Sequence, residues 1–227
     1  MPRPSELRKY YDALRSHFGH QRWWPGETPF EVIVGAILTQ NTAWTNVEKA
    51  IQNLRVNRLL DARRLDDIDL ETLAIAIRPA GYFHVKAKRV KAFVRWFLKR
   101  FGGQVERMRS EPVDRLRNEL LAVYGIGRET ADSILLYALG HPSFVVDAYT
   151  HRVLSRHEFV AEETSYEEMK ELFESTLPRE PALYNDFHAQ LVAVGKNYCR
   201  TTPRCEKCPL RKYLPQSSLP AREIAKE

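Results

Sequence analysis

Two glycines flank a single residue near the middle of the chain, in the run Tyr124-Gly125-Ile126-Gly127-Arg128. Glycines at this spacing permit a tight turn with positive φ and allow a close approach to the backbone. The backbone N–H groups that follow such a turn point outward at the start of a helix, where the helix dipole favours anions. With the charge of Arg128, these groups predict a phosphate site, and a plain connection between two helices is the alternative.

Tryptophan is concentrated in the N-terminal part of the chain, where Trp23 and Trp24 precede Pro25 and Trp44 follows. Two adjacent side chains cannot both face one core stripe, so at least one of the pair faces a cavity or the surface. Aromatic faces stack on cationic, electron-poor rings with about 0.5–2 kcal/mol for each contact. The tryptophans are therefore candidates for a binding pocket, with ordinary core packing as the alternative.

The three cysteines, Cys199, Cys205 and Cys208, are clustered near the C-terminus. A small, odd and clustered set of cysteines indicates a metal or cluster site rather than a disulfide framework. We therefore treat these thiols as candidate metal ligands.

Helical periodicity dominates the segments that must position these groups. Apolar residues recur with the spacing of a helix that buries one face in residues 30–38, 47–54, 90–98, 131–138 and 187–194. A capping box at residues 165–168 predicts a further helix start. The short apolar run 144–146 is interpreted as a connector rather than a strand. We therefore predict an all-α fold, with a loose tail from Pro215.

Composition indicates a soluble globular protein, since 44% of the 227 residues are hydrophobic and 28% are charged. Lysine and arginine exceed aspartate and glutamate by 35 − 29 = 6, which favours a polyanionic partner. No apolar run approaches the roughly 20 residues of a membrane helix, and no secretory pattern opens the chain. We expect a cytoplasmic protein that does not enter membranes.

The order of these motifs resembles the endonuclease III superfamily of base-excision DNA glycosylases, which carries a helix–hairpin–helix, a Gly/Pro-rich loop and an aspartate. The resemblance covers most of the chain and rests on residues 38–42, 81–89, 124–128 and 145–153. The Trp-Trp-Pro run, residues 78–82 and the Arg128-Glu129 pair are similar to the small bacterial 3-methyladenine DNA glycosylases.

This resemblance implies two helical lobes. The central lobe would span residues 29–141 and contain the helix–hairpin–helix. The second lobe would combine residues 1–28 with 142–227 and contain the cysteine loop. The active site is expected in the cleft between the lobes.

The resemblance also assigns Asp147 as the catalytic carboxylate. Cleavage of a base from deoxyribose builds positive charge on the sugar, which a carboxylate stabilises while it positions or deprotonates a water. An N-cap for the helix beginning near Ala148 is the alternative, and both roles are compatible. Bifunctional members carry a lysine where this chain has Glu129, and a carboxylate cannot form their Schiff base. We therefore predict a monofunctional glycosylase that uses water.

Such an enzyme must flip the damaged base out of double-stranded DNA and fill the gap. By family position, Gln40 would be inserted into the DNA with Asn41 beside it, while Gly125, Gly127 and Arg128 would contact the backbone. The base pocket for an alkylated purine such as 3-methyladenine would be formed by Trp23, Trp24, Pro25, Trp44 and Lys196. Oxidised pyrimidines or mismatched uracil or thymine are alternative targets, and a non-catalytic DNA-binding protein is an alternative of another class.

Two further expectations concern charge and metal. The basic run at residues 86–91 is either solvated surface charge or a phosphate contact. The cysteines resemble the family's iron–sulfur loop, but the position of its fourth cysteine is Leu214. We predict a 4Fe-4S cluster held by Cys199, Cys205 and Cys208 with an unassigned fourth ligand, the alternatives being a loop without a cluster or a zinc site. The protein is expected to be a monomer associated with the nucleoid.

Overall fold

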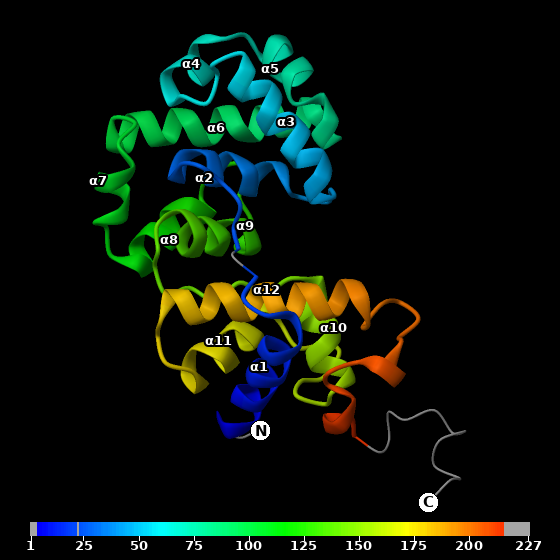
Figure 1. Cartoon of the computed structure of the whole chain (residues 1–227). Coiled ribbons are helices and arrows are strands. Elements are labelled where there is room, and N and C mark those ends of the chain that lie inside the picture. The colour runs from blue at the N-terminus through cyan, green and yellow to red at the C-terminus, as the bar shows by residue number, and fades with distance from the viewer. Residues whose placement is uncertain (1–3, 22, 216–227) are drawn as a thin grey trace, which may run out of the picture. The chain divides into compact units, whose positions relative to one another are not determined.

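The structure, a computed structural model, describes residues 4–21 and 23–215 (Figure 1). Every regular element in these residues is a helix, which confirms the predicted all-α fold. None of the described helices is long and apolar enough to cross a membrane. The tail predicted beyond Pro215 lies outside the described residues.

The chain divides into two compact units, one of Met1–Trp23 with Pro142–Glu227 and one of Trp24–His141. The sequence-based expectation had placed the first boundary at residue 29 and the second after residue 141. The first unit contains α1 (Pro4–Phe18), α10 (Ala148–Arg156), α11 (Tyr166–Thr176), α12 (Pro181–Asn197), and the short 3-10 helices η3 (Cys205–Lys207) and η4 (Arg211–Tyr213).

The long helix α12 is the centre of the first unit and packs against both α1 and α10. Ser165 and Glu168 form the predicted capping box at the start of α11. The run 144–146 is a buried connector, and its Phe144 ring stacks on Phe173 at a centroid distance of 3.8 Å. Aromatic packing around Phe144 therefore anchors the segment that leads into α10.

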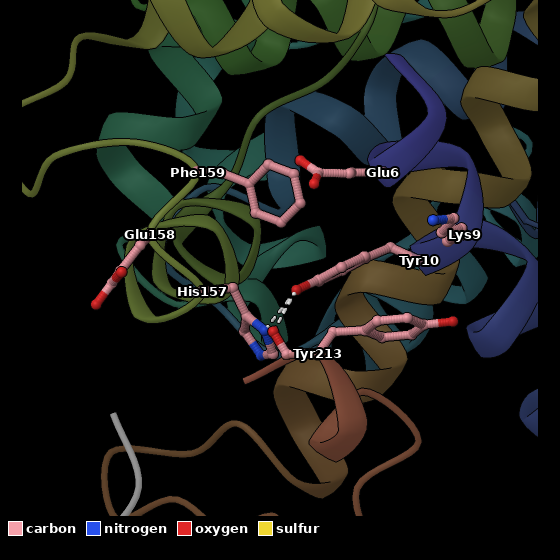
Figure 2. A pocket seen from close by; sticks show the side chains of 7 residues that line it. All are labelled: Glu6, Lys9, Tyr10, His157, Glu158, Phe159 and Tyr213. Carbon is pink, nitrogen blue, oxygen red and sulfur yellow. Dashed lines mark hydrogen bonds between the residues drawn. The ribbon is translucent and has the colours of Figure 1, made fainter. Parts of the chain in front are cut away.

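A second aromatic cluster joins α1 to the end of α10 and to η4 (Figure 2). The Tyr10 hydroxyl donates to the Tyr213 carbonyl at 3.1 Å and lies 2.8 Å from Nδ1 of His157. Burial lowers the pKa of His157 to about 4, so this imidazole is neutral at pH 7. These rings line a surface pocket of about 410 Å³ together with Glu6, Lys9, Glu158 and Phe159, and none of the predicted site residues lies in it.

The second unit contains α2 (Pro29–Leu38), α3 (Trp44–Val56), α4 (Ala62–Asp67), α5 (Leu70–Ala76), η1 (Arg78–Ala80), α6 (Phe83–Phe101), α7 (Val105–Arg109), α8 (Val113–Leu121), α9 (Arg128–Ser133) and η2 (Ile134–Ala138). The last of these is a π-helix that continues α9, where the sequence predicted one regular apolar stripe.

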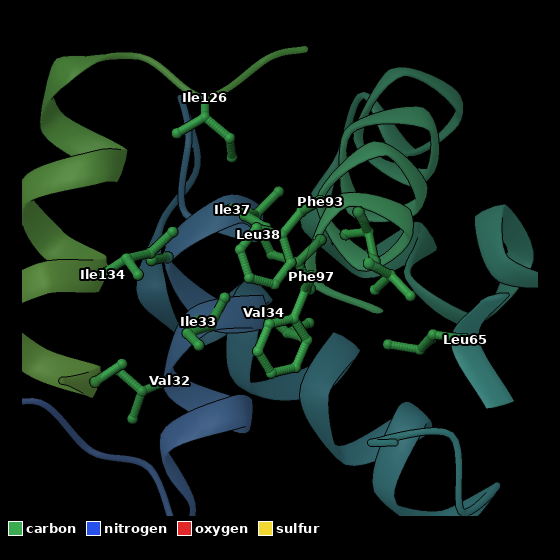
Figure 3. Close-up of a cluster of buried hydrophobic side chains, with 14 of the residues drawn as sticks. Val32, Ile33, Val34, Ile37, Leu38, Leu65, Phe93, Phe97, Ile126 and Ile134 are labelled. Atoms are coloured by element: carbon green, nitrogen blue, oxygen red, sulfur yellow. The ribbon is translucent and has the colours of Figure 1, made fainter. Parts of the chain in front are cut away.

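The core of the second unit surrounds α2, which is buried from Glu31 to Leu38 and packs against α3, α6 and α9 (Figure 3). The helix begins where Thr28 accepts the N–H of Glu31 at 3.1 Å and where Pro29 occupies the first turn. Phe93 and Phe97 of α6 stack over this core at a centroid distance of 5.6 Å. The burial of α2 fixes the position of its C-terminal turn, residues 39–43.

Candidate active site

Asp147 is the N-cap of α10, as the structural alternative had predicted. Its carboxylate accepts the backbone N–H of Thr150 at 2.7 Å, and 13% of its side chain is exposed. The second carboxylate oxygen, Oδ2, lies 3.6 Å from Nε2 of His188. The N-cap thus presents a partly exposed carboxylate with two fixed partners, which is compatible with the catalytic role expected for it.

His188 is a site residue that the sequence analysis missed. It lies on α12, and its side chain is only 5% exposed. Burial raises the pKa of Asp147, but the neighbouring His188 and the N–H of Thr150 hold that pKa below its usual value. The carboxylate is therefore ionised at neutral pH. The only signal in the sequence was a histidine inside an otherwise apolar helical stripe.

The pairing of α10 with α12 fixes this contact. Gly195 of α12 lies against Tyr149, and a Cβ atom at Gly195 would be 2.5 Å from Cδ1 of that ring. Arg152 donates to the carbonyls of Gly195 at 3.3 Å and Cys199 at 2.6 Å. These contacts set the register of the two helices and thereby the separation of the Asp147 and His188 side chains.

Three of the predicted pocket residues lie together in the unit of Trp24–His141. The Trp24 ring stacks on Tyr137 at 5.1 Å and meets the Trp44 ring edge-on at 4.9 Å. Pro25 and Trp44 line the same open groove of about 750 Å³. Tyr137 was not predicted as a site residue, because its position in the sequence fits an ordinary apolar helix.

The other two predicted pocket residues lie in the unit that contains Asp147. The ammonium group of Lys196 is 6.0 Å from the centroid of the Trp23 ring, a weak cation–π contact. The boundary between the two units falls between Trp23 and Trp24, so the two adjacent tryptophans belong to different units.

The Gly-x-Gly turn joins α8 to α9 and is held rigid from both sides. Gly125 has a φ of +79°, which glycine adopts at little cost. Asp132 of α9 is fully buried and accepts two hydrogen bonds from Arg117 of α8, at 2.8 and 2.9 Å. Bidentate pairs of this kind add geometric specificity, so the two helices of the hairpin keep one fixed arrangement.

Gly127 is the N-cap of α9 and places no side chain over the first turn of that helix. A Cβ atom there would have no neighbour within 4 Å, and the φ of −92° does not require glycine. Arg128 and Glu129 are exposed in the same turn. An open helix start of this kind can accept an anion.

Gln40 lies against this hairpin, and Asn41 beside it is exposed. The Gln40 amide donates to the Gly125 carbonyl and to the Thr130 hydroxyl, each at 2.9 Å. Its oxygen accepts a hydrogen bond from Arg89. Asn41 has a φ of +52° and so turns the chain sharply after Gln40.

The turn before α6 lies beside the turn at residues 39–43. Lys86 is buried and donates to the carbonyls of Leu38 at 2.9 Å and Ala80 at 2.7 Å, which ties the two turns together. Burial, with the charge of Arg89, lowers the pKa of Lys86 to about 8. Tyr82, in the turn before α6, is 73% exposed, and the sequence analysis did not propose it as a site residue.

The basic run at residues 86–91 was expected to be either solvated surface charge or a phosphate contact. Both interpretations are wrong for Lys86 and Lys91. Lys91 is buried like Lys86, and it donates to the carbonyls of Asp66 and Ile68. Periodicity did not reveal this, because a lysine can bury its stem and bond backbone carbonyls at helix ends.

The cysteine loop follows α12 and is bound by α10. Arg156 lies 3.4 Å from Sγ of Cys199 and donates to the carbonyl of Thr201 at 2.9 Å. Burial, with the neighbouring Cys205 and Cys199, raises the pKa of the Cys208 thiol to about 11. Both effects favour the protonated form of this thiol.

The donor set of this loop fits a four-iron cluster only in part. The loop supplies three thiols, but the fourth family position holds the apolar side chain of Leu214. Within residues 4–21 and 23–215, no group of three or more histidine, cysteine, aspartate or glutamate side chains has the geometry of a metal site.

Residues 34–179 match the family model described as the HhH-GPD superfamily base excision DNA repair protein. The chain is 46% identical to the "Putative DNA repair glycosylase MJ1434" of Methanocaldococcus jannaschii. The similarity extends over 208 residues, which are 91% of this chain and 94% of that protein. It is 31% identical over 187 residues to Endonuclease III of Thermotoga maritima, which covers 82% of each.

Two solved structures have the same fold. One is a non-covalent Endonuclease III–DNA complex, with a TM-score of 0.80 and 23% identity over 94% of this chain and 96% of that one. The other is the 3-methyladenine DNA glycosylase MagIII of H. pylori bound to 1,N6-ethenoadenine. Its TM-score is 0.73, with 28% identity over 86% of this chain and 98% of that one.

Proposed function

Because the chain belongs to the HhH-GPD superfamily and is a base excision repair DNA glycosylase, we propose that it hydrolyses the glycosidic bond of alkylated purines and forms no covalent intermediate. The observation that carries this proposal is the carboxylate of Asp147, placed between the N–H of Thr150 and the side chain of His188, in a chain with Glu129 at the family's lysine position.

In the proposed reaction, the bond from C1′ of the sugar to the purine nitrogen breaks, and its electron pair leaves with the base. An alkylated purine that carries a positive charge becomes neutral as it departs, so the leaving group needs little activation. Asp147 stabilises the positive charge that builds on the sugar. Water adds to C1′, and Asp147 accepts the proton that the water loses. No amine stands at position 129 to attack the sugar.

The aromatic residues support a purine as the target. Trp24 packs with both Trp44 and Tyr137, and the ammonium group of Lys196 lies over the ring of Trp23. Electron-rich rings favour a cationic, electron-poor base over a neutral pyrimidine. The likeness to a 3-methyladenine DNA glycosylase bound to ethenoadenine points in the same direction.

The partner in this proposal is double-stranded DNA that contains a damaged base. The open first turn of α9 at Gly127 and Arg128 would bind a backbone phosphate. Gln40 and the exposed Asn41 and Tyr82 lie on two adjoining turns and would occupy the space that the flipped base leaves.

A panel of damaged duplexes tests this function directly. We expect the protein to release 3-methyladenine from methylated DNA and to leave thymine glycol and mismatched uracil or thymine in place. Treatment with borohydride during turnover should trap no protein–DNA adduct, because no imine forms. Release of pyrimidines without alkylpurines, or efficient trapping, would contradict the proposal.

A 4Fe-4S cluster in the cysteine loop remains part of the proposal, with Cys199, Cys205 and Cys208 as its ligands. When bound, such a cluster would have a structural role. The test is the iron and sulfide content of protein purified without oxygen, together with its absorption near 400 nm. Zinc in place of iron, or an absence of both metals, would contradict it.

We also propose that the protein acts as a monomer at the nucleoid in the cytoplasm. Light scattering with and without a DNA duplex tests the oligomeric state. One chain for each duplex is the expected result, and a stable dimer would contradict it.

A further inference from the structure

Arg89 of α6 lies directly beneath the Gly-x-Gly turn. A Cβ atom at Gly125 would be 2.2 Å from Cγ and 2.7 Å from Cδ of Arg89, so the arginine stem occupies the space that any other residue would fill. The absence of a side chain at Gly125 is therefore required by Arg89 as well as by the positive φ.

The guanidinium group of Arg89 continues the contact to a second segment. It donates to the side-chain oxygen of Gln40, and the Gln40 amide donates to the Gly125 carbonyl and the Thr130 hydroxyl at 2.9 Å each. Gln40, Arg89, Gly125 and Thr130 form a closed network, which we call the hairpin–glutamine network. It joins three segments that are far apart in the sequence.

The environment of Arg89 differs from that of a residue that meets phosphates. Its side chain is half-buried, and its Nε is buried without a hydrogen-bond partner among the described residues. Lys88, the preceding residue, is exposed. A basic side chain that serves the DNA backbone would be expected to resemble Lys88 rather than Arg89.

We propose that Arg89 is a positioning residue that sets the inserted glutamine, Gln40, relative to the phosphate-binding hairpin. The proposal rests on the proposed function of these two elements in contact with DNA. Seating the hairpin on a phosphate then also places the Gln40 amide at the damaged nucleotide. Arginine is needed because its stem fills the space under Gly125 while its planar head reaches Gln40.

The test uses a duplex with a tetrahydrofuran abasic site opposite 2-aminopurine, whose fluorescence reports on the base facing the gap. We compare the wild type with Arg89→Met, which keeps the stem, Arg89→Lys, which keeps the charge, and Lys88→Met as the matched control. Affinity for this duplex and for an intact duplex is measured at several salt concentrations, and thermal melting confirms that each variant is folded.

Both Arg89 variants should lose most of the fluorescence change, since each lacks the guanidinium contact. Their preference for the abasic duplex over the intact duplex should fall about tenfold. Their salt dependence should equal that of the wild type. Lys88→Met should keep the fluorescence change but reduce the salt slope by about one charge. In a double-mutant cycle with Gln40→Ala, adding Arg89→Met should cause no further loss of the preference for the abasic duplex.

Rescue by Arg89→Lys with a reduced salt slope in Arg89→Met would identify a phosphate contact and overturn the proposal. A wild type that shows no fluorescence change would also overturn it. Because no base is released in this experiment, a wild type that places its glutamine normally but excises no alkylpurine would refute the proposed function and leave the role of Arg89 standing.

Discussion

The N-cap role of Asp147 is compatible with its proposed catalytic role because the cap uses only one of the two carboxylate oxygens. One oxygen accepts the N–H of Thr150, and the other faces His188. The N-cap role could be predicted from local sequence. The contact with His188 could not, because it depends on how α12 packs against α10.

Replacement of His188 should change the pH dependence of excision. The pKa of Asp147 lies below its usual value, so the ionised form is present at neutral pH and is lost only as the pH falls through that lowered pKa. In His188→Phe, only Thr150 would oppose the effect of burial, so the pKa of Asp147 should rise and move the acidic limb of the pH–rate profile to higher pH. The measurement is single-turnover excision from about pH 3 to about pH 8, a range that begins below the ordinary pKa of aspartate.

The matched control is His188→Gln, which keeps a hydrogen-bond donor for the carboxylate. It should hold the acidic limb closer to that of the wild type than His188→Phe does. Superimposable profiles for all three proteins would show that His188 does not act on Asp147.

At the scale of the elements, the two glycines of the hairpin should respond differently to alanine. Gly125→Ala forces a Cβ into the stem of Arg89 at a positive φ and should lower the free energy of unfolding by about 1–3 kcal/mol. Gly127→Ala meets no neighbour and should leave stability nearly unchanged while weakening DNA binding. Urea unfolding and duplex affinity check the pair, and equal stability loss in both variants would refute the assignment.

The ion pair that joins α8 to α9 should be costly to break. Arg117→Met leaves Asp132 buried without its bidentate partner, and we expect a loss of about 3–5 kcal/mol in the free energy of unfolding. Arg115→Met on the same helix, whose ion pairs are exposed, is the control and should cost less than about 1 kcal/mol. A similar cost for both variants would show that the buried pair does not hold the hairpin.

At the scale of the whole molecule, the sequence predicted the fold class and the helices with strong apolar periodicity, such as α2 and α6. It also predicted the capping box of α11, which depends on residues close together in the chain. It could not predict that Tyr137 stacks on Trp24 or that Arg89 bonds Gln40, because these contacts arise from tertiary packing. The buried lysines Lys86 and Lys91 escaped prediction for the same reason.

Stability should depend on pH through His157 in the unit that contains α1 and α10. The pKa of this histidine is lowered from 6.5 to about 4 in the folded protein, so the unfolded chain binds a proton at higher pH. Stability is therefore lost as the pH falls from about 6.5 towards 4, by about 3 kcal/mol. Urea midpoints should show this loss in the wild type and a smaller one in His157→Asn, and equal loss in both would contradict the assignment.

In the proposed function, Asp147 carries out the water-dependent removal of an alkylated purine. The most direct measurement is the rate of 3-methyladenine release from methylated DNA by the wild type and by Asp147→Asn, with affinity for the same DNA measured in parallel. We expect Asp147→Asn to keep the Thr150 cap, to bind the DNA and to release base at least about a hundredfold more slowly than the wild type. Release by Asp147→Asn at the rate of the wild type would contradict it.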